Sequence, residues 1–334
     1  MSKLSHSMRA AALCAFAFVT ASPLKSATFA VFDPKGSLET WPQSINDAGV
    51  VAGTYVVSAN RSHGFVRDVD GTITRFDVPK AIYTEPLAIS SDGRICGEYT
   101  KHNRYHEFSF VRETDGTITP FNPPHALQSV AVGFDGHGNI VGNFTTETIK
   151  SRGFIRSPDG KITVFDYPGS LATDVVSVNA AGTIAGLYVD DNFAYHGFIR
   201  TADGTMTSYD VGGSGTAAGQ INDDGTIAGE YFDFHAVDFG YVRAADGTIT
   251  HFNPKHSKDT EVYGLNARGT STGTFQTADK VIHAFVRGAG GVITKFDAPG
   301  AASTTTPTGI NKKNVITGSF TDSSGLTHGF IRSN

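Results

Sequence analysis

The sequence is poor in the residues that would cross-link a chain or hold a soft metal ion. Of its 334 residues, two are cysteine and one is tryptophan. Cys14 lies in an apolar N-terminal stretch, so Cys96 has no partner for an intramolecular disulfide. A metal site built from several cysteine thiolates is therefore excluded, and we expect Cys96 to be a buried space-filling residue rather than a nucleophile.

Long hydrophobic runs and a surplus of basic charge are also missing. The apolar run at residues 10–21 is too short to span a membrane and follows the cations Lys3 and Arg9. This layout predicts a secretory signal peptide over residues 1–27, cleaved near 21–27, and a secreted or periplasmic protein without membrane insertion. The net charge of −5 argues against nucleic acid as a partner.

What the sequence does contain is a unit that recurs seven times. Each unit ends in an aromatic residue followed by Asp or Asn, and the period of 43 to 45 residues is typical of a propeller blade. The aromatic residues are Phe32, Phe76, Phe121, Phe165, Tyr209, Phe252 and Phe296. Four short alternating segments, separated by Gly, Asn, Asp or Pro, predict four strands in each unit.

The two ends of the repeat array complete each other. The last unit stops at residues 328–332 and lacks a fourth strand, whereas residues 29–33 supply a spare one. Pairing these segments would complete the last unit and close a ring. We therefore predict an all-β fold, a seven-bladed β-propeller of four-stranded blades closed by the N-terminal strand. Residues 28–334 would form this single domain, and we expect a monomer.

The turn between the third and fourth strands predicts their register. Pro158-Asp159-Gly160 fits a three-residue loop with Gly160 in the left-handed conformation, which places Arg152 opposite Asp166. The same count gives the pairs His63–Asp77, Phe108–Asn122, His196–Asp210, Phe239–Asn253, His283–Asp297 and His328–Asp33. We interpret these pairs as structural, because a half-buried carboxylate needs a donor and a neutral amide costs less where Phe replaces that donor.

Two further residue types recur through the units. One arginine per unit predicts an ion pair or a hydrogen-bonding fork; these are Arg67, Arg112, Arg156, Arg200, Arg243, Arg287 and Arg332. An asparagine at the first turn predicts left-handed backbone there, at Asn46, Asn179, Asn222, Asn266 and Asn311. Residues that every unit needs are expected to support the fold rather than a site.

Strand direction separates two ends of the ring. Turns such as residues 46–49 and 70–71 are short and repetitive, and we name their side the tight-turn end. The opposite side, the variable end, carries the loops between second and third strands and the crossings between units. Because variable loops on a repeated scaffold carry binding residues in many proteins, we expect any site at the variable end.

Two sets of candidate residues belong to the variable end. Glu85, Asp174 and Glu261 lie on alternate units at the channel mouth, where they would hold a hard cation such as Ca²⁺, bind a polyol, or remain solvated surface acids. The second set is aromatic and acidic and suits a sugar or another amphipathic ligand, unless its rings pack on their own units. Its members are Trp41, Tyr188, Asp190, Asp191, Phe193, Tyr231, Phe232, Phe234 and His235.

The triplet His283-Ala284-Phe285, with His-Gly-Phe in three sister units, resembles the bacterial extracellular HAF repeat family. The resemblance covers residues 29–334 and implies export and repeats rather than a reaction. We expect a non-enzymatic propeller that binds a glycan or an extracytoplasmic protein. The alternative is a hydrolase or lyase that uses the channel-mouth carboxylates as metal ligands or as acid and base. Phosphate loops, zinc signatures and nucleophile elbows are missing from the sequence.

Overall fold

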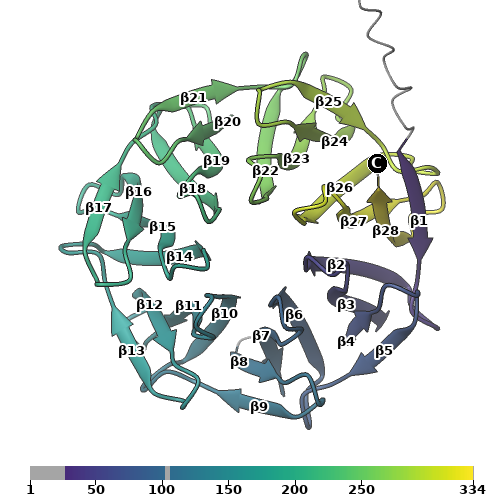
Figure 1. Cartoon of the computed structure of the whole chain (residues 1–334), viewed down its shortest axis with the longest axis horizontal. Coiled ribbons are helices and arrows are strands. Elements are labelled where there is room, and N and C mark those ends of the chain that lie inside the picture. The colour runs from purple at the N-terminus through teal and green to yellow at the C-terminus, as the bar shows by residue number, and fades with distance from the viewer. Residues whose placement is uncertain (1–26, 102–105, 334) are drawn as a thin grey trace, which may run out of the picture.

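The structure is a computed structural model that describes residues 27–101 and 106–333, and it contains no helix among them. Figure 1 shows the strands arranged around a common axis, with the first strand of each unit nearest the axis and the fourth at the rim. The predicted signal peptide lies outside the described residues, apart from Ala27. The all-β prediction is confirmed.

Each unit contributes strands of four kinds. The first strands are β2 (Glu39–Ile45), β6 (Tyr83–Ile89), β10 (Gln128–Phe134), β14 (Ala172–Val178), β18 (Gly215–Ile221), β22 (Asp259–Leu265) and β26 (Thr304–Ile310). The second strands are β3 (Val51–Ser58), β7 (Ile95–Thr100), β11 (Ile140–Thr145), β15 (Ile184–Val189), β19 (Ile227–Phe232), β23 (Ser271–Gln276) and β27 (Ile316–Thr321). The third strands are β4 (Arg61–Arg67), β8 (Glu107–Arg112), β12 (Ser151–Arg156), β16 (Tyr195–Arg200), β20 (Asp238–Arg243), β24 (Ile282–Arg287) and β28 (Thr327–Ser333).

The remaining strands are short and lie at the rim: β5 (Ile73–Phe76), β9 (Ile118–Phe121), β13 (Ile162–Phe165), β17 (Met206–Tyr209), β21 (Ile249–Phe252) and β25 (Ile293–Phe296), together with β1 (Thr28–Phe32). β1 pairs antiparallel with β28, in the position that β5 has on β4. The first and last strands of the chain therefore share one sheet. Units are numbered from unit 1 (β2 to β5) to unit 7 (β26 to β28 with β1).

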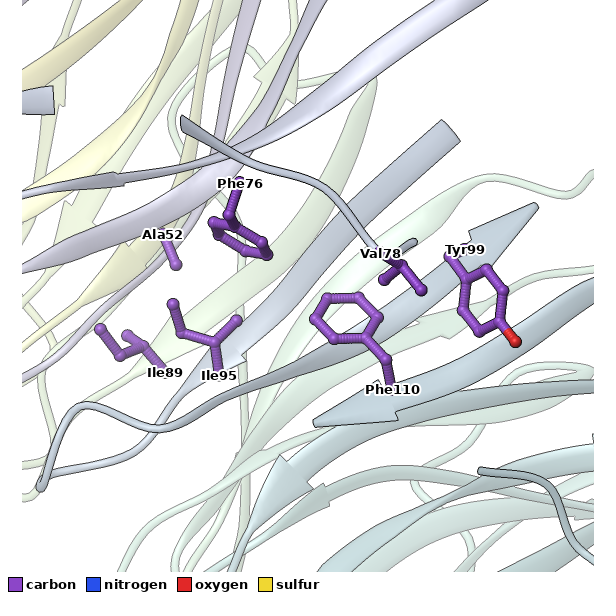
Figure 2. Close-up of a cluster of buried hydrophobic side chains, with 7 residues drawn as sticks. All are labelled: Ala52, Phe76, Val78, Ile89, Ile95, Tyr99 and Phe110. Atoms are coloured by element: carbon purple, nitrogen blue, oxygen red, sulfur yellow. The ribbon is translucent and has the colours of Figure 1, made fainter. Parts of the chain in front are cut away.

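The apolar core lies between neighbouring units. One cluster joins Ala52 and Phe76 of unit 1 to Ile95 and Phe110 of unit 2, and Figure 2 shows these side chains facing one another. Phe110 belongs to the third strand, and its counterparts in the other units are also fully buried. Because a single four-stranded sheet cannot cover its own apolar faces, each unit depends on its neighbours for burial.

A glycine recurs in the second strand of each unit because a side chain there would clash with the first strand. A Cβ atom at Gly53 would lie 2.3 Å from the carbonyl oxygen of Trp41, and one at Gly97 would lie 2.0 Å from that of Glu85. In both units the first strand shifts register directly beside this contact, between Pro42 and Ser44 in unit 1. The glycine therefore marks a β-bulge at which two backbones approach too closely for any side chain.

Candidate functional site

At the tight-turn end, an asparagine recurs in the turn between the first and second strands. The side-chain Oδ1 of Asn46 accepts hydrogen bonds from the amides of Gly49 and Val50, and its Nδ2 donates to the carbonyl of Ser90 in unit 2 at 3.3 Å. The left-handed residue of the turn is Gly49, so the predicted left-handed backbone at the asparagine is wrong. These asparagines instead cap their own turn and tie it to the next unit.

The same bond between units recurs around the tight-turn end. Nδ2 of one asparagine donates to the backbone carbonyl of the next in the pairs Asn179–Asn222, Asn222–Asn266, Asn266–Asn311 and Asn311–Asn46. A hollow of about 310 Å³ at this end is lined by these asparagines and their neighbours. Because their polar groups are already paired, the tight-turn end offers a ligand few free partners.

The recurring arginine stacks on an aromatic ring of the preceding unit. Arg200 lies 4.9 Å from the ring centre of Phe165, and Arg332 lies 4.8 Å from that of Phe296. The other five pairs, at 4.8 to 5.1 Å, are Arg67–Phe32, Arg112–Phe76, Arg156–Phe121, Arg243–Tyr209 and Arg287–Phe252. Nη1 of five of these arginines also donates a hydrogen bond to the carbonyl of the next residue. A cation–π contact that joins units thus replaces the expected ion pair, and the alternative of hydrogen bonding is met in part.

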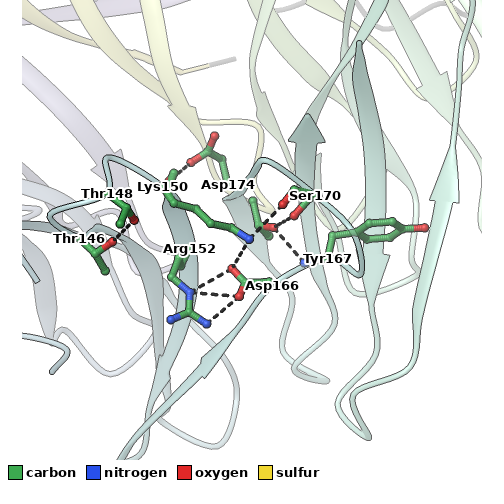
Figure 3. A network of polar contacts seen from close by, with 10 residues as sticks. Thr146, Thr148, Lys150, Arg152, Asp166, Tyr167, Ser170 and Asp174 are labelled. Atoms are coloured by element: carbon green, nitrogen blue, oxygen red, sulfur yellow. Dashed lines mark hydrogen bonds and ion pairs between the residues drawn. The ribbon is translucent and has the colours of Figure 1, made fainter. Parts of the chain in front are cut away.

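The predicted register of the third and fourth strands is confirmed by side-chain contacts. Arg152 makes bidentate hydrogen bonds to Asp166, the shortest at 2.6 Å, as Figure 3 shows. Nδ1 of the partnered histidine lies 2.7 to 2.9 Å from the carboxylate in the pairs His63–Asp77, His196–Asp210, His283–Asp297 and His328–Asp33. Where Phe replaces the donor, Asn122 accepts a hydrogen bond from the Ser129 hydroxyl instead.

At the variable end, several predicted ligand-binding residues support their own unit. Tyr188 stacks on Tyr167 at 3.7 Å and on His196 at 4.9 Å. Tyr231 occupies the equivalent position in unit 5 and stacks on Phe239 at 5.4 Å. These two rings are therefore engaged in packing, which the sequence left open as the alternative.

Among the predicted ligand-binding residues in the loops of units 4 and 5, some form turns or packing contacts and others are exposed. Asp190 caps its loop by accepting hydrogen bonds from the amides of Asn192 and Ala194, and Phe232 packs edge-on against Tyr195 at 5.7 Å. Four predicted residues remain open to solvent: Asp191, Phe193, Phe234 and His235. Phe193 is 76% exposed and Phe234 is 87% exposed. These loops thus present isolated aromatic tips rather than a continuous aromatic floor.

The three channel-mouth carboxylates face three separate hollows. Glu85 lines a hollow of about 420 Å³, and Asp174 lines one of about 220 Å³ and accepts a hydrogen bond from Ser151. Glu261 lies in a hollow of about 50 Å³. Within the described residues, Glu261 forms a possible metal-ligand group with Asp238 and Asp259, whose oxygen atoms lie within 4.8 Å of one another. The structure therefore does not bring Glu85, Asp174 and Glu261 to one point.

Two half-buried carboxyls, Glu98 and Glu230, were not predicted from the sequence. Glu98 and Glu230 follow the second-strand glycine, where unit 3 has Asn143. Burial, with the negative charges of Glu107 and Glu85, raises the pKa of Glu98 to about 8. Burial also raises the pKa of Glu230 to about 7, although its carboxylate accepts a hydrogen bond from the Val262 amide at 2.8 Å. Comparing this position across units would have revealed both acids.

The hollow between units 1 and 2 is the candidate site. Besides Glu85, its lining contains Trp41, Tyr83, Glu39 and Glu107. Trp41 is 36% exposed, and its Nε1 donates to Glu39 at 3.0 Å. Polar residues complete the wall: Gln43, Thr54, Ser58, Ser62 and Thr100. An aromatic side chain beside carboxylates and hydroxyls, in a volume of this size, suits a small polar ligand.

These features define a β-propeller with a candidate site at its variable end, and known structures agree on the fold. Neither a family model nor a curated protein matches the sequence. Virginiamycin B lyase from Staphylococcus aureus is 16% identical, with a TM-score of 0.63 over 92% of this chain and 99% of that one. A streptogramin B lyase structure is 15% identical, with a TM-score of 0.62 over 92% of this chain and 98% of that one.

A third similar structure is the β-propeller domain of the Trilobed protease from Pyrococcus furiosus. It is 13% identical, with a TM-score of 0.63 over 88% of this chain and 95% of that one. Identities this low show the fold alone. None of the described segments forms a helix long and apolar enough to cross a membrane.

Proposed function

We propose that the protein is an exported, non-enzymatic β-propeller that binds a glycan or protein ligand at its variable end. A small glycan is the better supported of the two. The observation that carries this proposal is the hollow of about 420 Å³ between units 1 and 2, with Trp41 and Glu85 in its wall. Its size fits a small molecule or one or two sugar rings, and carboxylate and hydroxyl groups beside an aromatic ring are suited to sugar hydroxyls.

The architecture proposed with this function is a closed ring of seven four-stranded blades. Pairing of β1 with β28 and the hydrogen bond from Asn311 to the Asn46 carbonyl at 3.0 Å both support closure. In such a ring, the crossings between blades and the loops between second and third strands surround one mouth. A ligand held at that mouth contacts residues from several blades without requiring any change in the repeated frame.

Export is proposed from residues 1–27, which have the layout of a signal peptide, and from the HAF-type repeat pattern. Expression in a bacterial host followed by cell fractionation and intact-mass measurement tests this point. We expect a periplasmic or secreted product that begins near residues 21–27. An uncleaved cytoplasmic product would contradict export.

Binding is tested with an array of immobilised glycans probed with the mature protein, beside the variants Trp41→Ala and Phe193→Ala/Phe234→Ala. We expect saturable binding that Trp41→Ala weakens at least tenfold and the loop double variant leaves unchanged, since those two rings lie outside the hollow. Loss of binding in the loop variant alone would move the site to the loops of units 4 and 5. Absence of glycan binding would contradict the glycan proposal.

A hydrolase or lyase remains the second candidate because of one observation. Glu98, whose pKa burial raises to about 8, lies directly opposite Glu85 across β6 and β7. A protonated carboxyl group beside a second carboxyl group is an arrangement suited to general acid and base catalysis. Release of reducing or unsaturated sugar from a glycan that binds, lost in Glu98→Gln but not in Glu147→Gln, would establish this activity.

A metal-assisted form of the second candidate would use Ca²⁺ at Asp238, Asp259 and Glu261, the group whose oxygen atoms lie together. Thermal unfolding with Ca²⁺ and with EDTA tests it. A rise in midpoint with Ca²⁺ that is lost in Asp259→Asn/Glu261→Gln would support a cation there. Equal midpoints would leave these acids as surface carboxylates.

A further inference from the structure

The histidine near the start of β28 contacts a carboxylate with each of its two ring nitrogens. Nδ1 of His328 lies 2.7 Å from Oδ2 of Asp33, and Nε2 lies 3.3 Å from Oδ2 of Asp322. Asp33 directly follows β1, whereas Asp322 begins the loop between β27 and β28. The imidazole therefore links the end of the first strand to the loop that precedes the last strand, two segments that lie side by side in Figure 1.

Two carboxylates on one imidazole favour its charged form. A neutral imidazole has one N–H group, so it donates to Asp33 or to Asp322, and its other nitrogen then turns a lone pair towards a carboxylate. The imidazolium donates to both. The hydrogen bond to Asp33 raises the pKa of His328 above its ordinary value; partial burial opposes this rise, and the bond to Asp322 adds to it.

The groups packed around His328 come from three other parts of the fold. Phe320 of β27 places its ring centre 5.3 Å from that of the imidazole, and Thr40 of β2 donates a hydrogen bond to Asp33 at 2.6 Å. Among the described residues, the charged groups that face His328 are Asp33 and Asp322. Both are acids, so the surroundings favour a positive charge on the ring.

Asp322 keeps its charge whatever the state of the histidine. Its carboxylate accepts hydrogen bonds from the Ser324 hydroxyl and from the amide of Leu326. These bonds, together with the contact to His328, lower the pKa of Asp322 to about 2. Near neutral pH, a change of protonation at this contact is therefore a change at His328.

The same arrangement recurs in unit 4. Nδ1 of His196 lies 2.7 Å from Asp210, and Nε2 lies 3.5 Å from Asp190, which caps the loop that carries Phe193. Tyr188 stacks on the imidazole. Burial alone would lower the pKa of His196, but the hydrogen bonds and charges of Asp210 and Asp190 outweigh it, so the pKa is raised.

Units 1 and 6 have the same histidine but place a cation beside it. Asp77, the partner of His63, is shared with Arg75 at 2.8 Å. In unit 6, Nζ of Lys295 lies 3.1 Å from Nε2 of His283. The carboxylate in these two units has a cationic neighbour other than the histidine, so its pairing does not depend on the charge of the imidazole.

We propose that His328 is a pH-sensitive pin, whose imidazolium holds β1 on β28 in acid and whose neutral form lets β1 loosen as the pH rises. His196 has the same role for β17 in unit 4. A folded pKa that is raised gives a stabilisation fully present below the unfolded value of about 6.5. That stabilisation is lost as the pH rises through the folded pKa.

Hydrogen–deuterium exchange of the purified mature protein tests the pin, because β5 is a matched strand within the same molecule. β5 pairs with β4 as β1 pairs with β28, and its histidine is the one whose carboxylate is shared with Arg75. Protection of both strands is measured at about pH 5.5 and pH 8.5, each relative to the exchange rate of the unfolded peptide. A change in overall stability alters both strands alike, so their ratio isolates the local contact.

We expect the protection of β1 to fall about fivefold relative to β5 between these two pH values, since bonds to a charged donor are replaced by at most one neutral donor. β17 should fall in the same direction. Parallel changes in β1 and β5 would overturn the proposal.

The chain itself supplies a version of the contact that does not titrate. Units 2 and 5 have Phe and Asn at these two positions, as in the pair Phe239 and Asn253. The double variant His328→Phe/Asp33→Asn copies them. We expect its β1 to remain paired and its protection relative to β5 to be the same at both pH values.

A single variant tests the second carboxylate without removing the histidine. Asp322→Asn keeps an oxygen for the loop amides and offers an N–H group to the neutral ring, so the fall should shrink to less than about twofold. Asp233→Asn is the control, because Asp233 caps the corresponding loop of unit 5, where Phe239 replaces the histidine. It should leave the fall in β1 unchanged.

A fall of the wild-type size in Asp322→Asn would overturn the role of the second carboxylate, and with it the pin. The same result in the double variant would assign the pH dependence to another group. If the double variant does not fold, Asp322→Asn and its control decide. Glycan binding has no bearing on these outcomes, so the pin and the proposed function stand or fall separately.

Discussion

The two ends of the propeller are made from the same repeat but differ in how their polar groups are paired. At the tight-turn end, Asn311 uses its side-chain oxygen for its own turn and its nitrogen for the Asn46 carbonyl. At the variable end, the Ser62 hydroxyl has no hydrogen-bond partner and Glu98 is half-buried beside other acids. The paired asparagines of the tight-turn end indicate a frame built for stability, whereas the unpaired Ser62 hydroxyl marks a place where a ligand would find a partner.

The largest expected effect is a dependence of stability on pH that arises at the variable end. Glu98 has a folded pKa of about 8, raised by burial and then by Glu107 and Glu85, whereas an unfolded glutamate titrates near 4.3. Between these values the folded protein holds a proton that the unfolded chain has released. Its stabilisation is therefore fully present below about pH 4.3 and is lost as pH rises towards 8.

Denaturant unfolding at about pH 5 and pH 8 measures this loss. We expect Glu98→Gln to lose about 3 kcal/mol less than the wild-type protein over this interval. Glu147→Gln, an exposed substitution in the β11–β12 loop, should behave as wild type. Identical pH dependence in the Glu98 variant would show that this carboxyl is already ionised at neutral pH.

The next largest effect belongs to the tight-turn end. Asn311→Ala removes two hydrogen bonds within the turn and the bond to Asn46, and it leaves buried backbone groups unpaired. We expect a loss of about 2 kcal/mol in the free energy of unfolding, measured by urea denaturation. The neighbouring exposed Lys313→Ala should change it by less than about 0.5 kcal/mol. Equal losses of stability in Asn311→Ala and Lys313→Ala would show that the asparagine contacts do not stabilise the fold.

A smaller effect compares two loops within the variable end. Phe193 adopts a left-handed conformation with φ of 62°, and Gly325 does so at the equivalent position of unit 7 with φ of 83°. We expect Gly325→Ala to lose about 1 kcal/mol on denaturation, because a side chain disfavours this conformation. Phe193→Gly should be neutral or slightly stabilising. A clear loss in Phe193→Gly would mean that the ring packs on its own unit after all.

The smallest effect concerns the other aromatic tip. Phe234 is 87% exposed, so Phe234→Ser should leave the unfolding free energy within about 0.5 kcal/mol of wild type. Tyr241→Leu serves as the contrast, since Tyr241 is fully buried and bonded to Tyr209 at 2.8 Å. Strong destabilisation by Phe234→Ser would show that the Phe234 side chain packs against the fold.

The sequence predicted the parts of the fold that depend on local pattern. The period, the turn at Gly160 and the pairing of Arg152 with Asp166 follow from spacing alone, because strand alternation and turn length determine register. The stacking of Arg200 on Phe165 did not follow. That contact crosses from one unit to the next, and only the packing of the two sheets brings the residues together.

The candidate site was predictable only in part. Trp41 and Glu85 were predicted as candidate residues of the variable end, and they line one hollow. Ser62 and Glu98 were missed because their significance lies in what surrounds them. The sequence does not show that the hydroxyl of Ser62 lacks a hydrogen-bond partner. It also does not show that burial raises the pKa of Glu98, because both properties depend on neighbouring strands.

The pairing of β1 with β28 also sets an order of events for the growing chain. His328 and Asp33, which meet in this pair, are 295 residues apart in the sequence. Hairpins within each unit form from local contacts, but β1 must wait as an unpaired edge strand until the last strand has been synthesised. A chain shortened before β28 would keep that edge exposed, together with Phe29, which contacts Phe330 of β28 in the complete fold, and would be prone to aggregate through it.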